Sequence, residues 1–339
     1  MSKTIIIAEA GVNHNGDLET AKKLISVAAD CGADFVKFQT FKTENLVTCD
    51  AQKAAYQSRN TNDPETSQFG MLKKLEMPAG WYPQLIAFAA SRKIQFLSTG
   101  FDEQSIDFLD KLGLPFFKIP SGEITNKPFL EHIARKKKPV ILSTGMATLQ
   151  EVKAAVKVLT HNGLAKDDIT VLHCTTEYPA PMASVNLKAM LTMRDELHLK
   201  VGYSDHTLGI EITVAAVALG AAVIEKHFTL DKKLPGPDHA ASLEPEELKQ
   251  MVAAIRNVEL AMAATGKKEP ASAEIKNINV ARKSLYYKTE LPAKHTITRH
   301  DLVALRPGDG ISPMEIDTVT GKPLQTSVKA GEKVSVSHF

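Results

Sequence analysis

The chain of 339 residues is 43% hydrophobic and 24% charged, an ordinary composition for a globular enzyme with a large core. Its formal net charge of +2 gives no support to nucleic-acid or membrane-surface binding, because those partners usually select a basic patch. Three cysteines without paired spacing argue against a disulfide framework, and no apolar stretch approaches membrane-spanning length, so we expect a cytoplasmic protein.

Short apolar runs alternate with segments of helical periodicity over the first three quarters of the chain. The first run, residues 5–8, precedes a helix that is predicted from Leu18, with apolar residues on one face and Gly32 at its end. Thr148 and Glu151 form a capping-box pattern at the start of a later helix. The other predicted strands are residues 35–38, 94–97, 116–119, 140–142, 169–172, 199–201 and 222–224.

Eight strand–helix units within about 265 residues are typical of a (β/α)8 TIM barrel. A doubly wound sheet is the alternative, but no glycine fingerprint follows the first strand, where a dinucleotide site would need one. We therefore predict an α/β fold with a barrel domain over residues 1–265. Residues 42–93 separate the second and third strands widely and are interrupted at 60–64; they could form a lid, a structural insertion or an oligomer contact.

The last quarter of the chain has a different pattern. Residues 266–281 are predicted to be a linker, because 265–270 are rich in Gly, Lys and Pro. Strand-like runs at 284–287 and 333–336 then alternate with Gly and Pro turns. We expect a separate, small and mostly β domain over residues 282–339.

Every predicted strand of the barrel runs from apolar residues into a polar cluster. The carboxyl ends of barrel strands form the active-site face, so these clusters should meet. Local capping can explain one polar strand end. Polar residues at the same end of all eight strands instead indicate a site. The clusters are Glu9 with 13–15, Lys37 with Gln39, 98–99, Lys118 with 121–123, 143–145, 173–178, 204–206 and 225–227.

Two histidines, His206 and His227, follow neighbouring predicted strands. A single strand-end histidine is more often hydrogen-bonded than metal-bound, but this pair is placed to share a divalent metal. With two imidazoles and oxygen ligands, Mn²⁺ or another exchangeable ion, such as Mg²⁺ or Co²⁺, fits better than a closed zinc site.

Lysines at strand ends predict an anion site. Lys37 and Lys118 would be costly to bury without negatively charged partners. Together with the hydroxyls of Thr99, Ser121 and Ser204, they suit a phosphate and a carboxylate.

Two glutamates, Glu9 and Glu123, are the candidates for proton transfer or hydroxyl recognition. Salt bridges to Lys37 and Lys118 are the alternative explanation for both carboxylates. Glu225, Lys226 and His239 have no predicted role beyond support of neighbouring groups by Glu225.

Eight motifs extend over essentially the whole chain: IAEAGVNHNG, VKFQTF, KIPSGE, ILSTGMAT, HCTTEYPAP, YSDHTLG, EKHFTLDKKLPGPDH and RPGDGISP. They resemble the sialic acid synthase family and occur in the family's order. This resemblance implies a barrel that condenses phosphoenolpyruvate with an N-acylated amino sugar, using Mn²⁺ or a similar ion. It also implies that residues 282–339 are an antifreeze-like (SAF) domain, which caps the barrel of the partner in a domain-swapped homodimer.

The resemblance also implies a role for each matching residue. Thr176 stands where some members have Asn, and its hydroxyl would contact phosphoenolpyruvate. Arg306 would reach the sugar from the SAF domain of the partner. The remaining assignments are Lys37, Thr99, Lys118, Ser121 and Ser204 for phosphoenolpyruvate, His206 and His227 for the metal, and Glu9, Gln39, Glu123, Tyr178 and Asp238 for the sugar.

The activity expected from this resemblance is the synthesis of a nine-carbon sialic acid from N-acetylmannosamine, with release of phosphate by C–O cleavage. The first alternative is a legionaminic or pseudaminic acid synthase that uses a 2,4-diacetamido sugar. Another phosphoenolpyruvate-dependent synthase, acting on a phosphorylated sugar, would need more basic residues. A sugar-binding or ice-binding protein is a different class, and it would need neither the histidine pair nor the glutamates.

Overall fold

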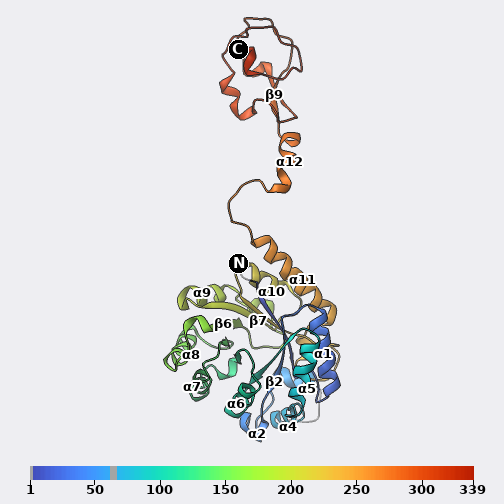
Figure 1. Cartoon of the computed structure of the whole chain (residues 1–339), viewed down its shortest axis with the longest axis vertical. Helices are drawn as coiled ribbons and strands as arrows, with labels where there is room; N and C mark the ends of the chain where they lie inside the picture. Colours follow the sequence, from blue (N-terminus) through green and yellow to red (C-terminus); the bar gives the residue numbers. More distant parts are fainter. Residues whose placement is uncertain (1–2, 62–66) are drawn as a thin grey trace. The chain divides into compact units, whose positions relative to one another are not determined.

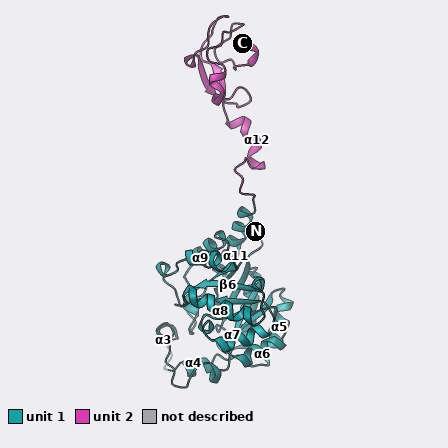
Figure 2. Cartoon of the chain, turned by 90° about the vertical axis from the view of Figure 1, so that its left-hand side faces the viewer, with its two compact units in different colours: residues 1–264 teal, residues 265–339 magenta. Residues whose placement is uncertain are grey.

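The computed structural model describes residues 3–61 and 67–339, so residues 62–64 of the expected break lie outside the described part. The chain forms two compact units, Met1–Ala264 and Thr265–Phe339, which are coloured separately in Figure 2. In the described part of the chain, the longest helices are too short or too polar to cross a lipid bilayer.

The first unit contains the predicted eight-stranded parallel barrel (Figure 1). The strands are hydrogen-bonded in the order β3-β2-β1-β8-β7-β6-β5-β4, and β3 lies next to β4 on the closing side. The fold prediction is confirmed. The strands are β1 (Ile5–Gly11), β2 (Phe35–Thr40), β3 (Gln95–Gly100), β4 (Phe117–Ile119), β5 (Val140–Ser143), β6 (Ile169–Cys174), β7 (Lys200–Asp205) and β8 (Val223–His227).

Several strands extend beyond the apolar runs that predicted them. For example, β7 and β8 each continue into their polar clusters, as far as Asp205 and His227. The main-chain hydrogen bonds of a parallel ladder do not depend on side-chain polarity, so the ladder continues after the side chains change character. The polar side chains are therefore held on strands rather than on loops.

Helices surround the strands (Figure 1). The predicted face of α1 is buried at Ala21, Leu24, Ile25 and Ala28, and the capping box of α8 at Thr148 and Glu151 is present, so both predictions are confirmed. The helices of this unit are α1 (Leu18–Asp30), α2 (Thr43–Leu46), α3 (Ala55–Thr61), α4 (Gln68–Lys73), α5 (Trp81–Ser91), α6 (Glu103–Lys111), α7 (Lys127–Arg135), α8 (Leu149–His161), α9 (Lys188–Leu197), α10 (Glu211–Ala218) and α11 (Pro245–Met262). Short 3₁₀ turns are η1 (Ser121–Glu123), η2 (Lys166–Asp168), η3 (Met182–Ser184) and η4 (His239–Ala241).

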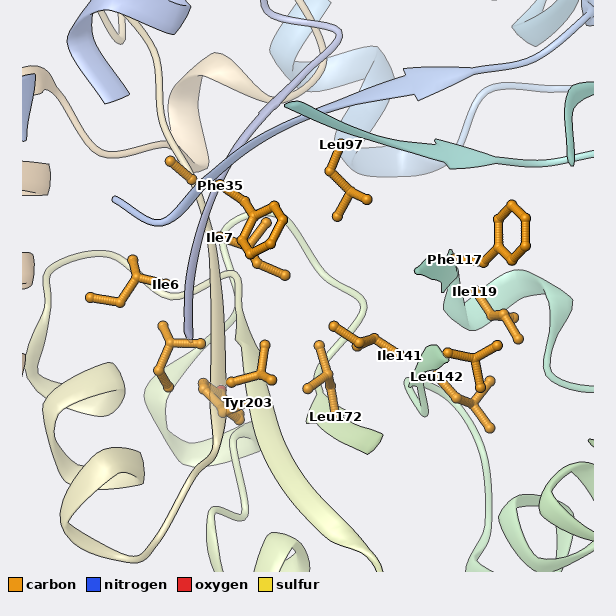
Figure 3. Close-up of a cluster of buried hydrophobic side chains, with 14 of the residues drawn as sticks. Ile6, Ile7, Phe35, Leu97, Phe117, Ile119, Ile141, Leu142, Leu172 and Tyr203 are labelled. Carbon is orange, nitrogen blue, oxygen red and sulfur yellow. The ribbon is translucent and has the colours of Figure 1, made fainter. Parts of the chain in front are cut away.

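The core lies beneath the polar strand ends. Figure 3 shows buried side chains from β1 to β7, including Ile7, Leu97, Leu172 and Tyr203. Each buried aliphatic side chain of this size contributes roughly 1.5–3 kcal/mol relative to an exposed one. This apolar base makes the barrel a rigid support for the polar side chains.

The long connection between β2 and β3 contains α2 to α5 and packs partly against loops that follow other strands. Asn60 of α3 donates hydrogen bonds to the carbonyl oxygens of Tyr178 at 3.3 Å and Pro237 at 2.8 Å. Arg59 pairs with Glu177 at 2.9 Å. Helix α3 is thus attached to the loops after β6 and β8 of its own unit.

The second unit has a small apolar core that includes Leu285, Tyr287 and Leu302. Helix α12 (Ser272–Ala281) occupies much of the segment expected as a linker, and none of its residues is buried. The run at 284–287 is strand β9, whereas the run at 333–336 forms only an isolated bridge at Lys333. The other elements are β10 (Leu302–Leu305), antiparallel to β9, and the 3₁₀ turns η5 (Arg299–Asp301), η6 (Pro313–Thr318) and η7 (Val336–His338).

Candidate active site

The carboxyl ends of the barrel strands enclose two adjoining cavities, of ≈320 and ≈270 Å³. Every predicted site residue of the first unit lines at least one of them. The larger cavity is lined by Glu9, Lys37, Gln39, Thr99, Lys118, Ser121, Thr176, Tyr178, Ser204, His206 and His227. The smaller is lined by Gln39, Glu123, Tyr178, His227 and Asp238. Arg306 belongs to the second unit, where it is exposed and donates to the carbonyl oxygen of Ala281.

Two lysines and two glutamates form a buried charge cluster in the larger cavity. Lys37 Nζ lies 2.6 Å from Glu9 Oε2 and 3.6 Å from Glu225 Oε2. Lys118 Nζ lies 3.2 Å from Glu225 Oε1, which also accepts a hydrogen bond from Ser204. The side chains are 2–5% exposed, so their charges interact with little screening by water.

The two glutamates of the cluster differ in pKa and therefore in charge. Burial raises the pKa of Glu9 to about 7, against the opposing charge of Lys37. Burial also acts to raise the pKa of Glu225, but the combined charges of Lys118 and Lys37 outweigh it and hold the pKa near 2. Near neutral pH, Glu225 is therefore ionised and Glu9 is partly protonated. Two ammonium groups then face fewer than two full negative charges, which favours an incoming anion.

Of the two glutamates for which salt bridges to Lys37 and Lys118 were the alternative explanation, one forms such a bridge. Glu9 does pair with Lys37, whereas Glu123 accepts a hydrogen bond from Asn126 at 2.6 Å. The partner of Lys118 is instead Glu225, a residue that sequence reasoning had left without a firm role. Lys118 is on β4 and Glu225 is on β8, which are not neighbours in the sheet, so the contact crosses the interior of the barrel.

Hydroxyl groups without partners lie near the lysines. Ser143 Oγ and Thr176 Oγ1 are buried and have no hydrogen-bond partner. Gly145 leaves space for the hydroxyls of Thr176 and Ser121, because a Cβ there would lie 2.2 Å from Thr176 Oγ1 and 2.8 Å from Ser121 Oγ. Unpaired buried hydroxyls are costly, so this geometry indicates a polar ligand. Ser143 was not among the predicted site residues, although its place at the end of β5 was a usable signal.

The two histidines face each other, with ring centroids 5.5 Å apart. His206 Nδ1 lies 2.6 Å from the carbonyl oxygen of Thr175, so this nitrogen carries the proton and Nε2 is free to accept. Burial lowers the pKa of both rings, and for His227 the neighbouring His206 lowers it further. Both imidazoles are therefore neutral at pH 7, the form that binds metals.

The histidine pair fits a divalent ion. His227 Nδ1 is buried without a hydrogen-bond partner and lies 3.8 Å from Asp238 Oδ2. The carbonyl oxygen that orients His206 is the kind of neighbour that metal-binding histidines usually have. Within residues 3–61 and 67–339, no group of three or more His, Cys, Asp or Glu is arranged for a metal. A metal at this pair would take its other ligands from substrate and water.

The smaller cavity combines a polar edge with an apolar wall. Burial raises the pKa of Asp238, on the polar edge, to about 6. Tyr56 of α3 stacks on Tyr178 with ring centroids 4.9 Å apart, and Gln68 of α4 also lines both cavities. Sequence reasoning missed Tyr56 and Gln68. The apolar wall consists of Val12, Phe41, Leu46, Val47, Met71, Leu72, Leu75 and Phe101, and no Lys or Arg among the described residues lines this cavity.

His239 has a structural place next to the site. It is fully buried, with Nδ1 2.6 Å from Thr229 Oγ1 and Nε2 3.3 Å from Asn15 Oδ1. Asn15 also donates to the carbonyl oxygen of Pro235 at 2.9 Å. These bonds hold the loop that carries Asp238 against the turn that follows β1.

Comparisons with known proteins give concordant matches. Residues 24–268 match the NeuB family and residues 282–339 match the SAF domain. The chain is 54% identical to N,N'-diacetyllegionaminic acid synthase from Campylobacter jejuni, over 98% of this chain and 99% of that protein. It is 50% identical to the synthase of the same name from Legionella pneumophila, over 98% and 94%. The crystal structure of N-acetylneuraminic acid synthetase from Leptospira borgpetersenii, in complex with citrate, matches with a TM-score of 0.70 and 34% identity, over 82% of this chain and 90% of that one.

Proposed function

Because the chain belongs to the NeuB family and ends in a SAF domain, we propose that it condenses phosphoenolpyruvate with a 2,4-diacetamido sugar to make N,N'-diacetyllegionaminic acid. The observation that carries this proposal is near-full-length identity of 54% and 50% to two synthases of that product. The matches thus favour the legionaminic acid alternative over the N-acetylmannosamine substrate that the sequence analysis placed first.

The smaller cavity supports an uncharged, acylated sugar. A second acetamido group would bring a methyl to the apolar wall around Met71 and Leu75, while Asp238 and Tyr178 would meet polar atoms. A phosphorylated sugar would need cationic residues, and the described lining offers none, whereas Glu123 and Asp238 would repel a phosphate.

The charge cluster supports phosphoenolpyruvate in the larger cavity. Lys37 and Lys118 would bind its phosphate and carboxylate, and Thr99 and Ser121 would donate from their hydroxyls. Ser204 would turn its hydroxyl from Glu225 to the ligand. The unpaired hydroxyls of Ser143 and Thr176 would gain partners, a role for Thr176 that agrees with the expectation from sequence. These interactions persist through the reaction, so they contribute more to binding than to the chemical step.

His206 and His227 would hold the divalent ion, Mn²⁺ by preference, with Mg²⁺ or Co²⁺ as alternatives. The bound ion would supply Lewis acidity at the aldehyde oxygen of the open-chain sugar. Tyr178 lies against both rings, with centroids 4.1 and 5.6 Å away, and would keep bulk water from that oxygen.

In the proposed reaction, carbon 3 of phosphoenolpyruvate bonds to the aldehyde carbon and a water oxygen adds to carbon 2. The C–O bond to phosphate then breaks, which gives the nine-carbon 2-keto acid and inorganic phosphate. One water proton ends on the new hydroxyl and the other leaves with phosphate. Glu9 is the better candidate to move the first proton, because its pKa of about 7 suits transfer near neutrality. Glu123 and Gln39 would contact sugar hydroxyls.

We further propose that the protein acts in the cytoplasm as a domain-swapped homodimer. The SAF unit would cap the barrel of the partner, where Arg306 would contact the acyl end of the sugar. Exposure of the Arg306 side chain in its own unit supports this role: Nε donates to the carbonyl oxygen of Ala281, and the terminal nitrogens of the guanidinium would meet the other surface.

Release of inorganic phosphate from phosphoenolpyruvate tests the activity. The assay would add a 2,4-diacetamido sugar, N-acetylmannosamine or N-acetylmannosamine 6-phosphate in parallel, with Mn²⁺ present. We expect the highest kcat/KM with the diacetamido sugar. A preference for either of the other two would overturn the substrate, and no phosphate release with any of them would overturn the function.

A further inference from the structure

A completely buried ion pair joins β7 to β8 next to the histidines. Asp205 and Lys226 have side chains that are 0% exposed, and Lys226 Nζ lies 2.6 Å from Asp205 Oδ2. The two residues are direct partners in the β7–β8 ladder. Lys226 also donates to the carbonyl oxygen of Thr207, while Asp205 Oδ1 accepts from the main-chain and side-chain donors of Thr207.

This pair lies on the opposite face of the strands from the cavities. Successive residues of a strand point to opposite faces, and Ser204 and Glu225 line the larger cavity whereas Asp205 and Lys226 do not. The other charges that act on Lys226 are Glu211 of α10 and Glu247 of α11, on the helical side. The pair therefore has no access to substrate and cannot take part in the chemical step directly.

Stability alone does not account for an ion pair in this position. Removing two charges from water costs about as much as their attraction returns, and apolar residues of similar volume often stabilise a core equally well. A buried pair can instead fix one arrangement of the elements that carry it.

The contacts of Lys226 lie on both sides of His206 in the chain. Asp205↔Lys226 is the last pair of the β7–β8 ladder, so His206 has no ladder partner on β8. Both neighbours of His206 are nevertheless tied to Lys226: Asp205 by the ion pair and Thr207 by its carbonyl oxygen. Lys226 itself directly precedes His227. The ammonium group of the residue before His227 thus contacts both residues that flank His206, through the carboxylate of Asp205 and the carbonyl oxygen of Thr207.

We propose that the Asp205–Lys226 pair is a positioning device, which holds His206 and His227 at the separation that a shared divalent metal requires. This inference rests on the metal site of the proposed function. It assigns a role to Lys226, the middle residue of the polar end of β8, and to Asp205, its counterpart on β7.

The test measures Mn²⁺ affinity of the full-length protein from the electron paramagnetic resonance signal of free Mn²⁺. Asp205→Leu combined with Lys226→Met removes both charges and keeps the volume. We expect this variant to fold with a similar thermal midpoint and to bind Mn²⁺ at least about 10-fold more weakly. Saturating Mn²⁺ should restore much of kcat, so the Mn²⁺ concentration needed for half-maximal activity should change more than kcat.

Arg256→Met is the matched control, since it breaks an ion pair to Asp34 near the start of β2. It should lower the thermal midpoint without changing Mn²⁺ affinity.

A folded double variant whose Mn²⁺ affinity stays within about twofold of the parent would overturn the positioning role alone. A parent protein that binds no Mn²⁺ would overturn the metal site of the proposed function and this inference with it. If the double variant does not fold, Lys226→Arg decides, because it keeps the charge but cannot reproduce both contacts of the ammonium. Weaker Mn²⁺ binding by that variant supports the proposal, and unchanged binding overturns it.

Discussion

Tyr56 of α3 stacks on Tyr178, which follows β6, with ring centroids 4.9 Å apart and an interplanar angle of 28°. This contact joins the long β2–β3 connection to the histidine pair, because Tyr178 also lies against His206. The connection is therefore part of the wall of the site. The sequence analysis left three roles open for this connection: a lid, a structural insertion or an oligomer contact. The contacts of Tyr56 with Tyr178 favour the lid.

Replacing Tyr56 should weaken sugar binding more than turnover. Tyr56→Ala removes the ring that supports Tyr178 in both cavities, so we expect KM for the sugar to rise roughly 10-fold, as the loss of one aromatic contact of about 1–1.5 kcal/mol implies. KM for phosphoenolpyruvate should change little. Steady-state kinetics with each substrate varied in turn measures both values. Tyr56→Phe keeps the stacking and is the matched control; equal sugar KM values for the two variants would contradict this role.

Gly145 should be required at the phosphoenolpyruvate end. A Cβ at Gly145 would lie 2.2 Å from Thr176 Oγ1 and 2.8 Å from Ser121 Oγ, so Gly145→Ala must displace side chains that face the charge cluster. Since a misplacement of about 1 Å can cost on the order of 100-fold in rate, we expect kcat/KM for phosphoenolpyruvate to fall by about that factor.

Gly80→Ala is the control for this change, because a Cβ at Gly80 meets no atom within 4 Å. Its kinetics and thermal midpoint should match those of the parent. Parent-like kcat/KM in the Gly145→Ala variant would show that the hydroxyls near Gly145 do not bind the substrate.

The strand ends were predictable because chain order alone brings the carboxyl ends of barrel strands to one face. This rule placed Lys37, Lys118, His206 and His227 together without any knowledge of contacts. It could not pair the charges, because Lys118 and Glu225 come from strands that are not neighbours and meet only across the interior of the folded barrel.

Other parts of the site lay beyond sequence reasoning for different physical reasons. Tyr56 and Gln68 come from short helices of the β2–β3 connection, whose path across the barrel is not encoded by hydrophobic periodicity. The role of Lys226 depended on a main-chain contact to Thr207 that no side-chain pattern records. Helix α12 was missed because residues 265–270, directly before it, indicated a linker, and none of its own residues is buried.

Stability should fall as the pH is lowered from about 6.5 towards 4. His14 is fully buried, and burial lowers its pKa to about 4, whereas an unfolded histidine titrates near 6.5. Between these values the unfolded state binds more protons, so the contribution is fully present above pH 6.5 and is lost on acidification. For His14 the loss at pH 5 is about 2 kcal/mol of unfolding free energy.

Urea unfolding at pH 7.5 and pH 5 measures this dependence. His14→Gln should reduce the difference between the two pH values, because glutamine does not titrate. His161→Gln is the control, since His161 is exposed, and it should leave the difference unchanged. An undiminished pH dependence in the His14→Gln variant would show that another group is responsible.

Removal of divalent metal should abolish turnover while leaving phosphoenolpyruvate binding nearly intact. The ion pairs of the charge cluster that would bind phosphoenolpyruvate do not include the imidazoles, so chelation should lower kcat sharply and leave phosphoenolpyruvate affinity within about threefold in equilibrium titration. His227→Ala should resemble the chelated protein and should not respond to added Mn²⁺. His173→Ala is the matched control, because His173 lies on β6 of the same barrel but hydrogen-bonds the carbonyl oxygen of Val185 instead of facing the pair. Full activity of the chelated parent, or Mn²⁺ rescue of His227→Ala to parental kcat, would exclude the histidine pair as the metal site.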